Sequence, residues 1–340
     1  MTTKSSSART IIDFQIYAVG GTAIDILRDL QAGNSSQPIE GMDHTTISYV
    51  DTSDSNTGSI DQNLIYRFPG LQGGGKNRQF IAQKTAPHIS DVLTRFKPKK
   101  FNLVVFGAGG ASGAAVGPMI VSELMKRGQN VMVATVGSPM GSSTELSNTI
   151  NTIQSLGNFT KIYKTPLAVF YRQNDEENTV GAVDRAIRSM VYISSALFSN
   201  LNHGIEETDL KNFLNFNKVT TFDPALVNFD YFQQVISIPN HVQAIAQATL
   251  ESDDTDLDSK VDAGFADVAY RCSGRLNPSL NEHVEKITPI HFLLMRGDMA
   301  VRLSTLRQRL QAIEQAQAQR AELVEDVGLE IGEDADGMTF

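Results

Sequence analysis

Short, almost continuously apolar segments alternate with longer amphipathic segments through the first half of the chain. The apolar segments are rich in β-branched and aromatic residues, which predicts strands that are buried on both faces of a sheet. In the segments between them, apolar residues recur every three or four positions, which predicts helices. We expect strands at 11–19, 47–50, 101–106, 131–136 and 166–171, and helices near 22–32, 86–96, 112–127 and 143–157.

The alternation of strands and helices predicts the topology of this half. Consecutive strands joined by helices pair in parallel through right-handed crossovers, which places helices on both faces of the sheet. An amphipathic segment at 177–202 predicts a helix of roughly 39 Å that ends at Gly204, since glycine suits a helix C-cap. The pattern weakens afterwards, with strands expected at 235–238 and 288–295 and a helix at 301–319.

The composition is that of a soluble globular protein. The 340 residues are 41% hydrophobic and 20% charged, which suits roughly two packed domains. No apolar run approaches the ~20 residues of a membrane helix, so we expect neither a signal peptide nor a membrane partner. Cys272 is the sole cysteine, which excludes an intrachain disulfide and a cysteine-based metal site and favours a cytoplasmic location.

Negative charge is concentrated at the C-terminal end. The net charge is −9, and seven acidic residues but no basic residue follow Arg320. An acidic chain is a poor electrostatic match for nucleic acid or anionic lipid, so we expect no direct binding of nucleic acid. The acidic segment is either a contact for a basic partner or a solubilising tail.

Three glycine-rich segments lie where open parallel sheets bind ligands, after the carboxyl ends of strands. Gly20 and Gly21 open the first helix, the sequence GAGGASG at 107–113 opens another, and a basic turn at 73–78 lies between them. Glycines let the backbone approach phosphate closely, and a helix N-terminus offers free N–H groups. A single glycine loop after a strand is needed for packing as often as for ligand binding. Two such loops that converge on one crevice favour a polyphosphate ligand.

The type of nucleotide is narrowed by what the loops lack. The Walker pattern G-x-x-x-x-G-K-[ST] does not occur in the chain, which excludes a P-loop. A Rossmann site is the competing interpretation, because VVFGAGGASG resembles a strand–GxGxxG–helix unit. However, Ser112 takes the third glycine position, and the strand at 131–136 ends without the carboxylate that would bind a ribose. An NAD(P)-dependent oxidoreductase therefore stays open as the alternative function.

The glycine loop at 109–113 (GGASG) resembles the GGGTGSG signature of the tubulin/FtsZ superfamily, a loop that holds GTP phosphates without a P-loop. The order of further motifs is similar to that of the bacteriophage tubulins (PhuZ), over about residues 11–320 and strongly before Asp209. Ala111 replaces a glycine of the signature, and Ala23 and Asp25 replace residues that are often Gly and Asn. The matching motifs are Gly20-Gly21-Thr22, Asp51-Thr52-Ser53-Asp54, Gly74-Gly75-Lys76-Asn77-Arg78 and Asn202-His203-Gly204.

The resemblance implies an α/β fold with a specific division of the chain. We expect a doubly wound parallel-sheet GTPase domain at 1–175 and a long central helix at 176–204. A smaller α+β C-terminal activation domain is expected at 205–320, followed by the acidic tail at 321–340.

The same resemblance implies GTP or GDP as the bound nucleotide, with Mg²⁺, and assigns residues to it. No side chain is assigned to the metal directly, and Asp51 is assigned to it only through a water. Glu145 is expected at the ribose, while Asn174 and Asp184 are expected to read guanine. A carboxylate can accept the N1–H and N2–H donors of guanine as a pair. Without the family resemblance, Asp184 would be interpreted as a solvated residue on the expected central helix. The expected nucleotide-binding residues are Gly20, Gly21, Thr22, Asp25, Asp51, Gly75, Lys76, Asn77, Gly109, Gly110, Ala111, Ser112, Gly113, Glu145, Asn174 and Asp184.

An acidic segment at 206–209 follows the expected central helix. In the resembled family, two acids at this place polarise water against the γ-phosphate of a neighbouring subunit, and Glu206 and Asp209 have that spacing. Glu207 is the alternative partner of Asp209. Without the resemblance, these acids are typical of a helix start, with Thr208 as the N-cap.

The resemblance also implies the partner, which is a second copy of the chain. Head-to-tail contacts that do not close into a ring build an open filament. Such a filament would position phage DNA in the cytoplasm of the infected host, and a non-hydrolysing scaffold is a further alternative. The residues expected to hold the next subunit are Asp326, Glu330, Glu333, Asp334, Asp336 and Phe340, with Arg296, Arg302, Arg307 and Arg309 as candidate counterparts.

Overall fold

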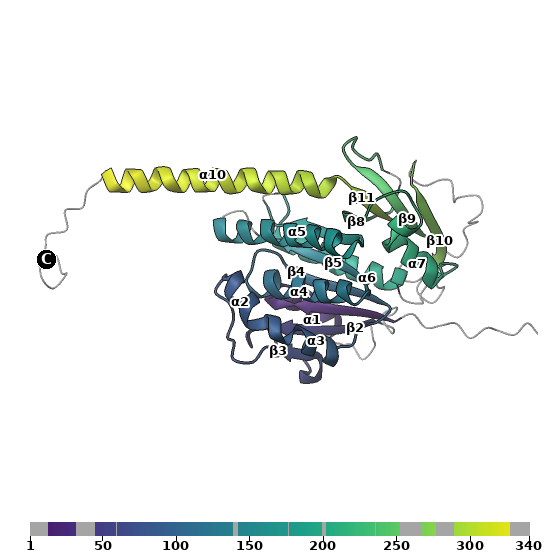
Figure 1. The fold of residues 1–340 in the computed structure, drawn as a ribbon, viewed down its shortest axis with the longest axis horizontal. Helices are drawn as coiled ribbons and strands as arrows, with labels where there is room; N and C mark the ends of the chain where they lie inside the picture. The colour runs from purple at the N-terminus through teal and green to yellow at the C-terminus, as the bar shows by residue number, and fades with distance from the viewer. Residues whose placement is uncertain are drawn as a thin grey trace, which may run out of the picture.

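A single sheet of eleven strands organises the part of the chain that the structure describes (Figure 1). The structure is a computed structural model that describes residues 13–31, 45–58, 60–138, 142–175, 177–198, 202–234, 236–251, 267–276 and 289–326. The first six strands of the sheet pair in parallel throughout; the sequence predicts the parallel pairing and five of these strands but misses β3. In sheet order they are β3 (Ile65–Arg67), β2 (Thr45–Asp51), β1 (Phe14–Val19), β4 (Phe101–Gly107), β5 (Asn130–Gly137) and β6 (Leu167–Gln173).

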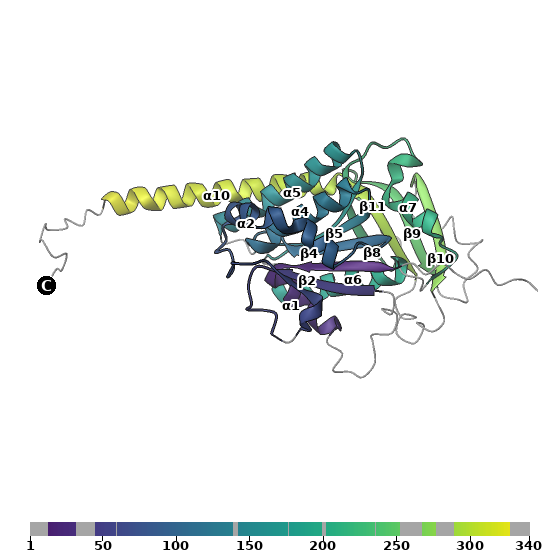
Figure 2. The same cartoon turned by 60° about the horizontal axis from the view of Figure 1, so that its bottom comes forward.

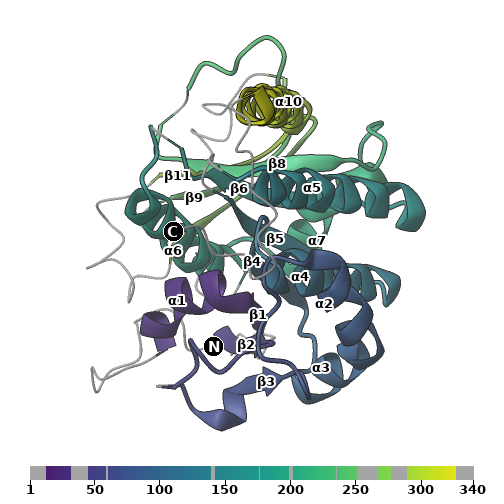
Figure 3. The ribbon, with the colours of Figure 1, turned by 90° about the vertical axis from the view of Figure 1, so that its left-hand side faces the viewer.

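Helices cover both faces of this parallel half, which explains why its strands are apolar along their whole length (Figure 3). One face packs against α1 (Gly20–Gln31) and α6 (Val180–Phe198). The other face packs against a second group of helices, so all six residues of β1 are buried. This second group comprises α2 (Arg78–Thr85), α3 (Ile89–Arg95), α4 (Ser112–Lys126), α5 (Ser143–Tyr163) and α10 (Asp298–Asp326), with a short 3₁₀ turn at Ala86–His88 (η2). A second 3₁₀ turn, η1 (Gln62–Leu64), packs through Leu64 on the face of α1 and α6.

The C-terminal half continues the same sheet with mixed pairing. Strand β8 pairs in parallel with β6, and β11 then runs antiparallel to both of its neighbours. The expected strand at 235–238 is wrong, because 236–238 are not in a strand and the alternating sequences on either side form β8 and β9 instead. The elements of this half are α7 (Glu207–Leu214), η3 (Phe216–Lys218), β8 (Leu226–Phe232), β11 (Ile290–Arg296), β9 (Gln243–Glu251), β10 (Tyr270–Leu276) and β7 (Asn202–His203).

The central helix is shorter than the sequence predicts, and Gly204 is not its cap. Helix α6 ends at Phe198, whose ring stacks on Phe14 in the core. Asn202 then lies in strand β7, and its side-chain amide donates to the carbonyl of Leu197 at 2.9 Å. The last turn of α6 is therefore closed by this asparagine from the following strand, while Gly204 lies beyond that strand.

The last helix is longer than the sequence predicts and projects from the body. Helix α10 includes residues 321–326, so the expected acidic tail begins inside a helix, and only Asp326 of the expected polymer-contact residues lies within the described part of the chain. Leu306 packs α10 against the body near α5, whereas every residue from Glu314 to Ala321 is exposed. Figures 1 and 2 show its free end extending past α5 and α2. No helix within the described ranges has the length and apolar character needed to cross a membrane.

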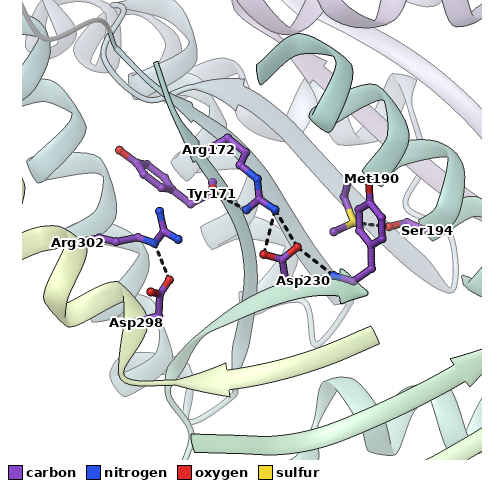
Figure 4. A network of polar contacts seen from close by, with 8 residues as sticks. Tyr171, Arg172, Met190, Ser194, Asp230, Asp298 and Arg302 are labelled. Carbon is purple, nitrogen blue, oxygen red and sulfur yellow. Dashed lines mark hydrogen bonds and ion pairs between the residues drawn. The ribbon is translucent and has the colours of Figure 1, made fainter. Parts of the chain in front are cut away.

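Strand β6 is tied to both neighbours of its carboxyl-terminal end (Figure 4). The Arg172 guanidinium donates to both carboxylate oxygens of Asp230 on β8, at 2.8 and 3.0 Å. On the α10 side, Arg302 stacks 5.7 Å from the ring centroid of Tyr171 and pairs with Asp298. Arg302 is therefore engaged within its own chain.

Candidate functional site

The two predicted glycine loops meet at the carboxyl ends of β1 and β4. Gly20 has φ +77°, and a Cβ built there would lie 2.8 Å from the main-chain nitrogen of Gly113. A Cβ on Gly113 would lie 2.7 Å from the carbonyl oxygen of Gly107. Close packing of two backbones therefore requires glycine at 20 and 113. Around them, Thr22 lies against Gly107, Asn56 against Gly21, and Ser138 against Gly109.

This packing makes a sharp distinction between two glycines of one loop. We expect Gly113→Ala to lower the free energy of unfolding by about 1–3 kcal/mol, because its methyl group would press on main-chain atoms that cannot move aside. Gly110→Ala is the matched control, since a Cβ at Gly110 meets nothing within 4 Å. Thermal denaturation of the two nucleotide-free variants tests this, and equal midpoints would contradict the packing argument.

The glycine turn at 73–77 packs onto the loop at 107–113. The main-chain N–H of Gly73 donates to the carbonyl of Thr52 at 3.0 Å, and the Thr52 hydroxyl lies 2.6 Å from that of Ser112. A Cβ on Gly74 would lie 2.5 Å from that of Ala111, which is buried. Three segments that are distant in sequence therefore form one continuous surface.

Helix α5 anchors the same turn from the other side. The Lys76 ammonium pairs with Glu145 at 3.0 Å, and Gly75 and Lys76 both have positive φ angles. The Asn77 side chain accepts from the N–H of Phe80 at 2.9 Å, so it is the N-cap of α2. Glu145 thus contacts the turn in this structure, and its contact with a ribose stays a prediction of the family resemblance.

Asp51 is a buried carboxyl group at the end of β2. Its side chain accepts from the N–H of Thr52 at 2.7 Å, and the residue is 3% exposed. Burial raises the pKa of Asp51 from 3.8 to about 6, and the charge of Asp25 adds to this. A buried acid beside a phosphate site suits Mg²⁺, which protein sites bind through one or two carboxylates together with phosphate oxygens.

The raised pKa of Asp51 predicts a pH dependence of stability. Between about pH 4 and pH 6 the folded state holds a proton that the unfolded state has lost, so stability from this group falls as the pH rises. Above pH 6 the buried charge costs about 3 kcal/mol, and Asp51→Asn should recover most of it in nucleotide-free protein. Denaturation from pH 4 to 8 measures this, and an unchanged pH profile in the variant would contradict it.

Asn174 and Asp184 are the two residues that the family resemblance assigns to the base. Asn174 comes directly after β6, is 9% exposed, and its side-chain oxygen is buried without a hydrogen-bond partner. Asp184 lies on α6, where burial raises its pKa, the charge of Arg188 lowers it and that of Asp25 raises it further. An unpartnered buried acceptor is costly in a folded protein and fits a ligand that carries N–H donors.

The acidic segment at 206–209 lies near the amino-terminal end of β4, whereas the glycine loops lie at the carboxyl-terminal ends of β1 and β4. The Glu206 N–H donates to the Asp209 carboxylate at 3.0 Å, so Glu206 is the N-cap of α7 and Thr208 is not. Glu207 pairs with Lys211 at 2.6 Å and with Lys100, and hydrogen bonds from both lysines hold the pKa of Glu207 below its usual range. Glu206 is exposed, and Asp209 also accepts from the Tyr270 hydroxyl at 3.3 Å.

The acidic segment and the glycine loop at 107–113 are separated by the length of strand β4. Lys100, which pairs with Glu207, directly precedes β4, and the loop at 107–113 directly follows it. Seven residues of strand span roughly 20 Å. Figures 1 and 2 show α7 at one end of the sheet and α2, which follows the glycine turn, at the other. The acids therefore lie too far away to contact the glycine loops of their own subunit.

Comparison with known proteins decides the family. The chain is 30% identical over 244 residues to a phage tubulin-like protein of Pseudomonas phage PhiPA3, a match that covers 70% of this chain and 73% of the relative. It belongs to the phage tubulin-like proteins. A second member, from Pseudomonas phage phiKZ, is 28% identical over 191 residues, covering 52% of this chain and 57% of that protein. No protein-family model matches the sequence.

Solved structures agree with this membership at the level of the fold. A protofilament of TubZ from bacteriophage PhiKZ has a TM-score of 0.77 at 23% identity, over 90% of this chain and 92% of that one. The phage tubulin PhuZ with GDP has a TM-score of 0.77 at 20% identity, over 91% and 93% of the two chains. The tubulin-like fold is thereby confirmed, and the oxidoreductase alternative has no support among these relatives.

Several residues that contact the glycine segments of this phage tubulin-like protein cannot be predicted from the sequence. Thr52, Asn56 and Asn148 lie against the glycine segments, and only Thr52 belongs to a motif that the sequence singles out. Within the described ranges, no group of three or more His, Cys, Asp or Glu side chains is arranged to hold a metal ion.

Proposed function

We propose that this phage tubulin-like protein binds and hydrolyses GTP and polymerises head to tail, with Glu206 and Asp209 of one subunit completing the site of the next. The observation that carries the proposal is the placement of the glycine loops and the acidic pair at opposite ends of β4. A subunit stacked on the glycine loops would present its acidic segment to them. Related structures described as a protofilament and a filament support such stacking.

The candidate residues suit both the phosphate end and the base end of one guanine nucleotide. Main-chain N–H groups at the starts of α1 and α4 would hold phosphates, because free helix N-termini favour anions. At the other end, the unpartnered oxygen of Asn174 and the carboxylate of Asp184 would accept the N–H donors of guanine. Mg²⁺ held through water near Asp51 would neutralise the charge on the terminal phosphates.

Hydrolysis requires orientation of water more than covalent help. Asp209 and the exposed Glu206 would orient a water against the γ-phosphate of the neighbouring subunit. Glu206 is the better partner of Asp209, because Glu207 is neutralised by Lys100 and Lys211. In an isolated subunit the same pair stabilises the start of α7, since Asp209 accepts from the Glu206 N–H.

A concentration series tests this function directly. We expect phosphate release per subunit to be negligible in dilute protein and to rise where GTP-dependent light scattering begins, while ATP supports neither. Normal turnover by unassembled protein would overturn the proposal of a shared site. Assembly without phosphate release would favour the non-hydrolysing scaffold. A role in positioning phage DNA, and a location in the host cytoplasm, stay predictions of the family resemblance.

The acidic tail is the second part of the assembly proposal. Helix α10 projects past the edge that carries the glycine loops, toward the place of the next subunit (Figure 1). That subunit would present the far end of its own α5, where Lys161 and Lys164 line a cavity of about 570 Å³. Ile162 and Val219, close to this cavity in sequence, are 66% and 45% exposed. Two lysines beside exposed apolar side chains suit a tail of acids that ends in Met338-Thr339-Phe340. The tail residues Glu330, Glu333, Asp334, Asp336 and Phe340 lie outside the described residues.

A double-mutant comparison tests this contact. Deletion of residues 327–340 and the pair Lys161→Glu with Lys164→Glu should each raise the protein concentration needed for assembly, by about tenfold or more. Combining them should add nothing further, because both remove one interaction. Sedimentation with GTP measures the threshold. Unchanged assembly after the deletion would identify the tail as a solubilising segment, and full additivity would place its contact elsewhere.

A further inference from the structure

Asn148 joins two glycine segments of the candidate site, the turn at 73–77 and the loop at 107–113. It lies on α5, is 8% exposed, and its side-chain NH₂ group donates to the carbonyls of Lys76 and Gly109, each at 3.1 Å. These carbonyls are 72 and 39 residues away in the sequence. One amide group supplies two hydrogens and here uses both on main-chain oxygens. Asn148 therefore fixes the distance between the glycine turn and the loop at 107–113.

The glycine turn needs such an anchor because its backbone is unusual. Lys76 has φ +64°, a left-handed conformation that non-glycine residues adopt only when their surroundings hold them there. Its carbonyl is held by Asn148 and its ammonium group by Glu145, one turn earlier on the same face of α5. On the far side, the Arg78 guanidinium donates to the carbonyl of Ala114 at 2.9 Å. Helix α5 thus supplies both contacts that fix Lys76.

The opposite partner of Asn148, the carbonyl of Gly109, lies in a closely packed part of the loop. A Cβ on Gly109 would lie 1.7 Å from the Ser138 hydroxyl and 3.0 Å from the carbonyl of Glu145, so this part of the loop is closely surrounded. The hydrogen bonds of Asn148 to the carbonyls of Gly109 and Lys76 therefore hold the turn at a defined distance from the loop at 107–113. By contrast, Asn151, one turn further along α5, is exposed, and among the interactions described its side-chain amide donates only to the Ser147 hydroxyl, at 3.5 Å.

We propose that Asn148 is a positioning residue that holds the turn at 73–77 at the distance a γ-phosphate requires, and so sets the preference of the protein for GTP over GDP. This inference rests on the proposed function, with the α- and β-phosphates at the loop 107–113 and the γ-phosphate at the turn 73–77, as the family resemblance implies. Both nucleotides contact that loop, but only GTP gains from a turn that is already in place. Removing Asn148 should therefore weaken GTP binding selectively, because ordering the turn would then draw on binding energy.

The test compares Asn148→Ala with Asn151→Ala in the full chain, below the concentration of assembly. We expect Asn148→Ala to weaken binding of GTPγS about tenfold and binding of GDP by less than about threefold, while Asn151→Ala changes neither. Equilibrium fluorescence titration measures both nucleotides, and the ratio is the readout that a merely structural role would not move. Equal losses for both nucleotides, or no loss for either, would overturn the inference.

Asn148→Ser keeps the test valid if the alanine variant does not fold. A serine hydroxyl can donate to only one of the two carbonyls, so its ratio of GTPγS to GDP affinity should lie between those of the wild type and the alanine variant. A wild-type ratio in this variant would also count against the inference. If the wild-type protein binds no guanine nucleotide, the proposed function itself fails, which is a different result from an unchanged ratio.

Discussion

Replacing Asp209 by alanine is expected to slow GTP hydrolysis by about 10²–10⁴-fold while filaments still form and persist. The variant loses a carboxylate that would orient water in the neighbouring subunit's site, but its own nucleotide pocket lies at the other end of β4 and is unchanged. Phosphate release and GTP-dependent sedimentation, measured on the same sample, check both halves of this expectation. Turnover at the wild-type rate in assembled protein would contradict it.

The control for this variant is Glu207→Gln. Glu207 is adjacent to the proposed pair but is engaged with Lys100 and Lys211, so its loss should leave turnover within about threefold of the wild type. Loss of Asp209 also removes an acceptor at the start of α7, which costs about 0.5–2 kcal/mol of stability. Thermal denaturation separates that cost from the effect on hydrolysis, because a folded variant with slow turnover isolates the chemical role.

Replacing Asp184 by asparagine is expected to weaken GTP binding by about 10²–10³-fold, through loss of two charge-assisted hydrogen bonds. The same change should strengthen binding of xanthosine triphosphate, since the asparagine NH₂ group can donate to the oxygen that replaces the guanine amino group. Competition titration with the two triphosphates measures the exchange of specificity. Equal losses for both would show that Asp184 supports α6 and does not read the base.

Mixing the two variants gives a stricter test of the shared site. Subunits with Asp184→Asn retain the acidic pair, and subunits with Asp209→Ala retain the nucleotide pocket. In mixed filaments, a subunit of the first kind would supply Asp209 to a nucleotide held by the second kind. We expect phosphate release from the mixture to exceed the sum of the separate samples several-fold. No gain in filaments that contain both variants would indicate that each subunit completes its own site.

Local patterns in the sequence predict the parallel half of the fold because its strands are buried on both faces and its helices are amphipathic. The C-terminal half is harder to predict, since its strands are interrupted by polar residues that the sheet pairs across long distances. For example, the Thr249 hydroxyl oxygen on β9 and Nδ1 of His291 on β11 lie 3.1 Å apart. Gly204 illustrates another limit, because the end of α6 is closed by a side chain from β7.

The glycine segments of the candidate site can likewise be found from the sequence, but their supports cannot. Glycine runs after strands are local features, so the meeting of Gly20 with Gly113 follows from the topology of a parallel sheet. Asn148 and Thr52 act through main-chain carbonyls and a hydroxyl that only the folded chain brings near. The choice between Glu206 and Glu207 depends in the same way on Lys100, which is about one hundred residues distant.

The separation of the acidic pair from the glycine loops makes the two termini of any assembled row chemically different. Under the proposed function, the last subunit at one terminus would have no successor to supply the acids, so its GTP would outlive that of subunits in the interior. At the other, the acids face solvent and have no nucleotide to act on. A newly added subunit at the first terminus would therefore keep its GTP until the next subunit arrives. The order of addition would thus set when each subunit becomes ready to disassemble.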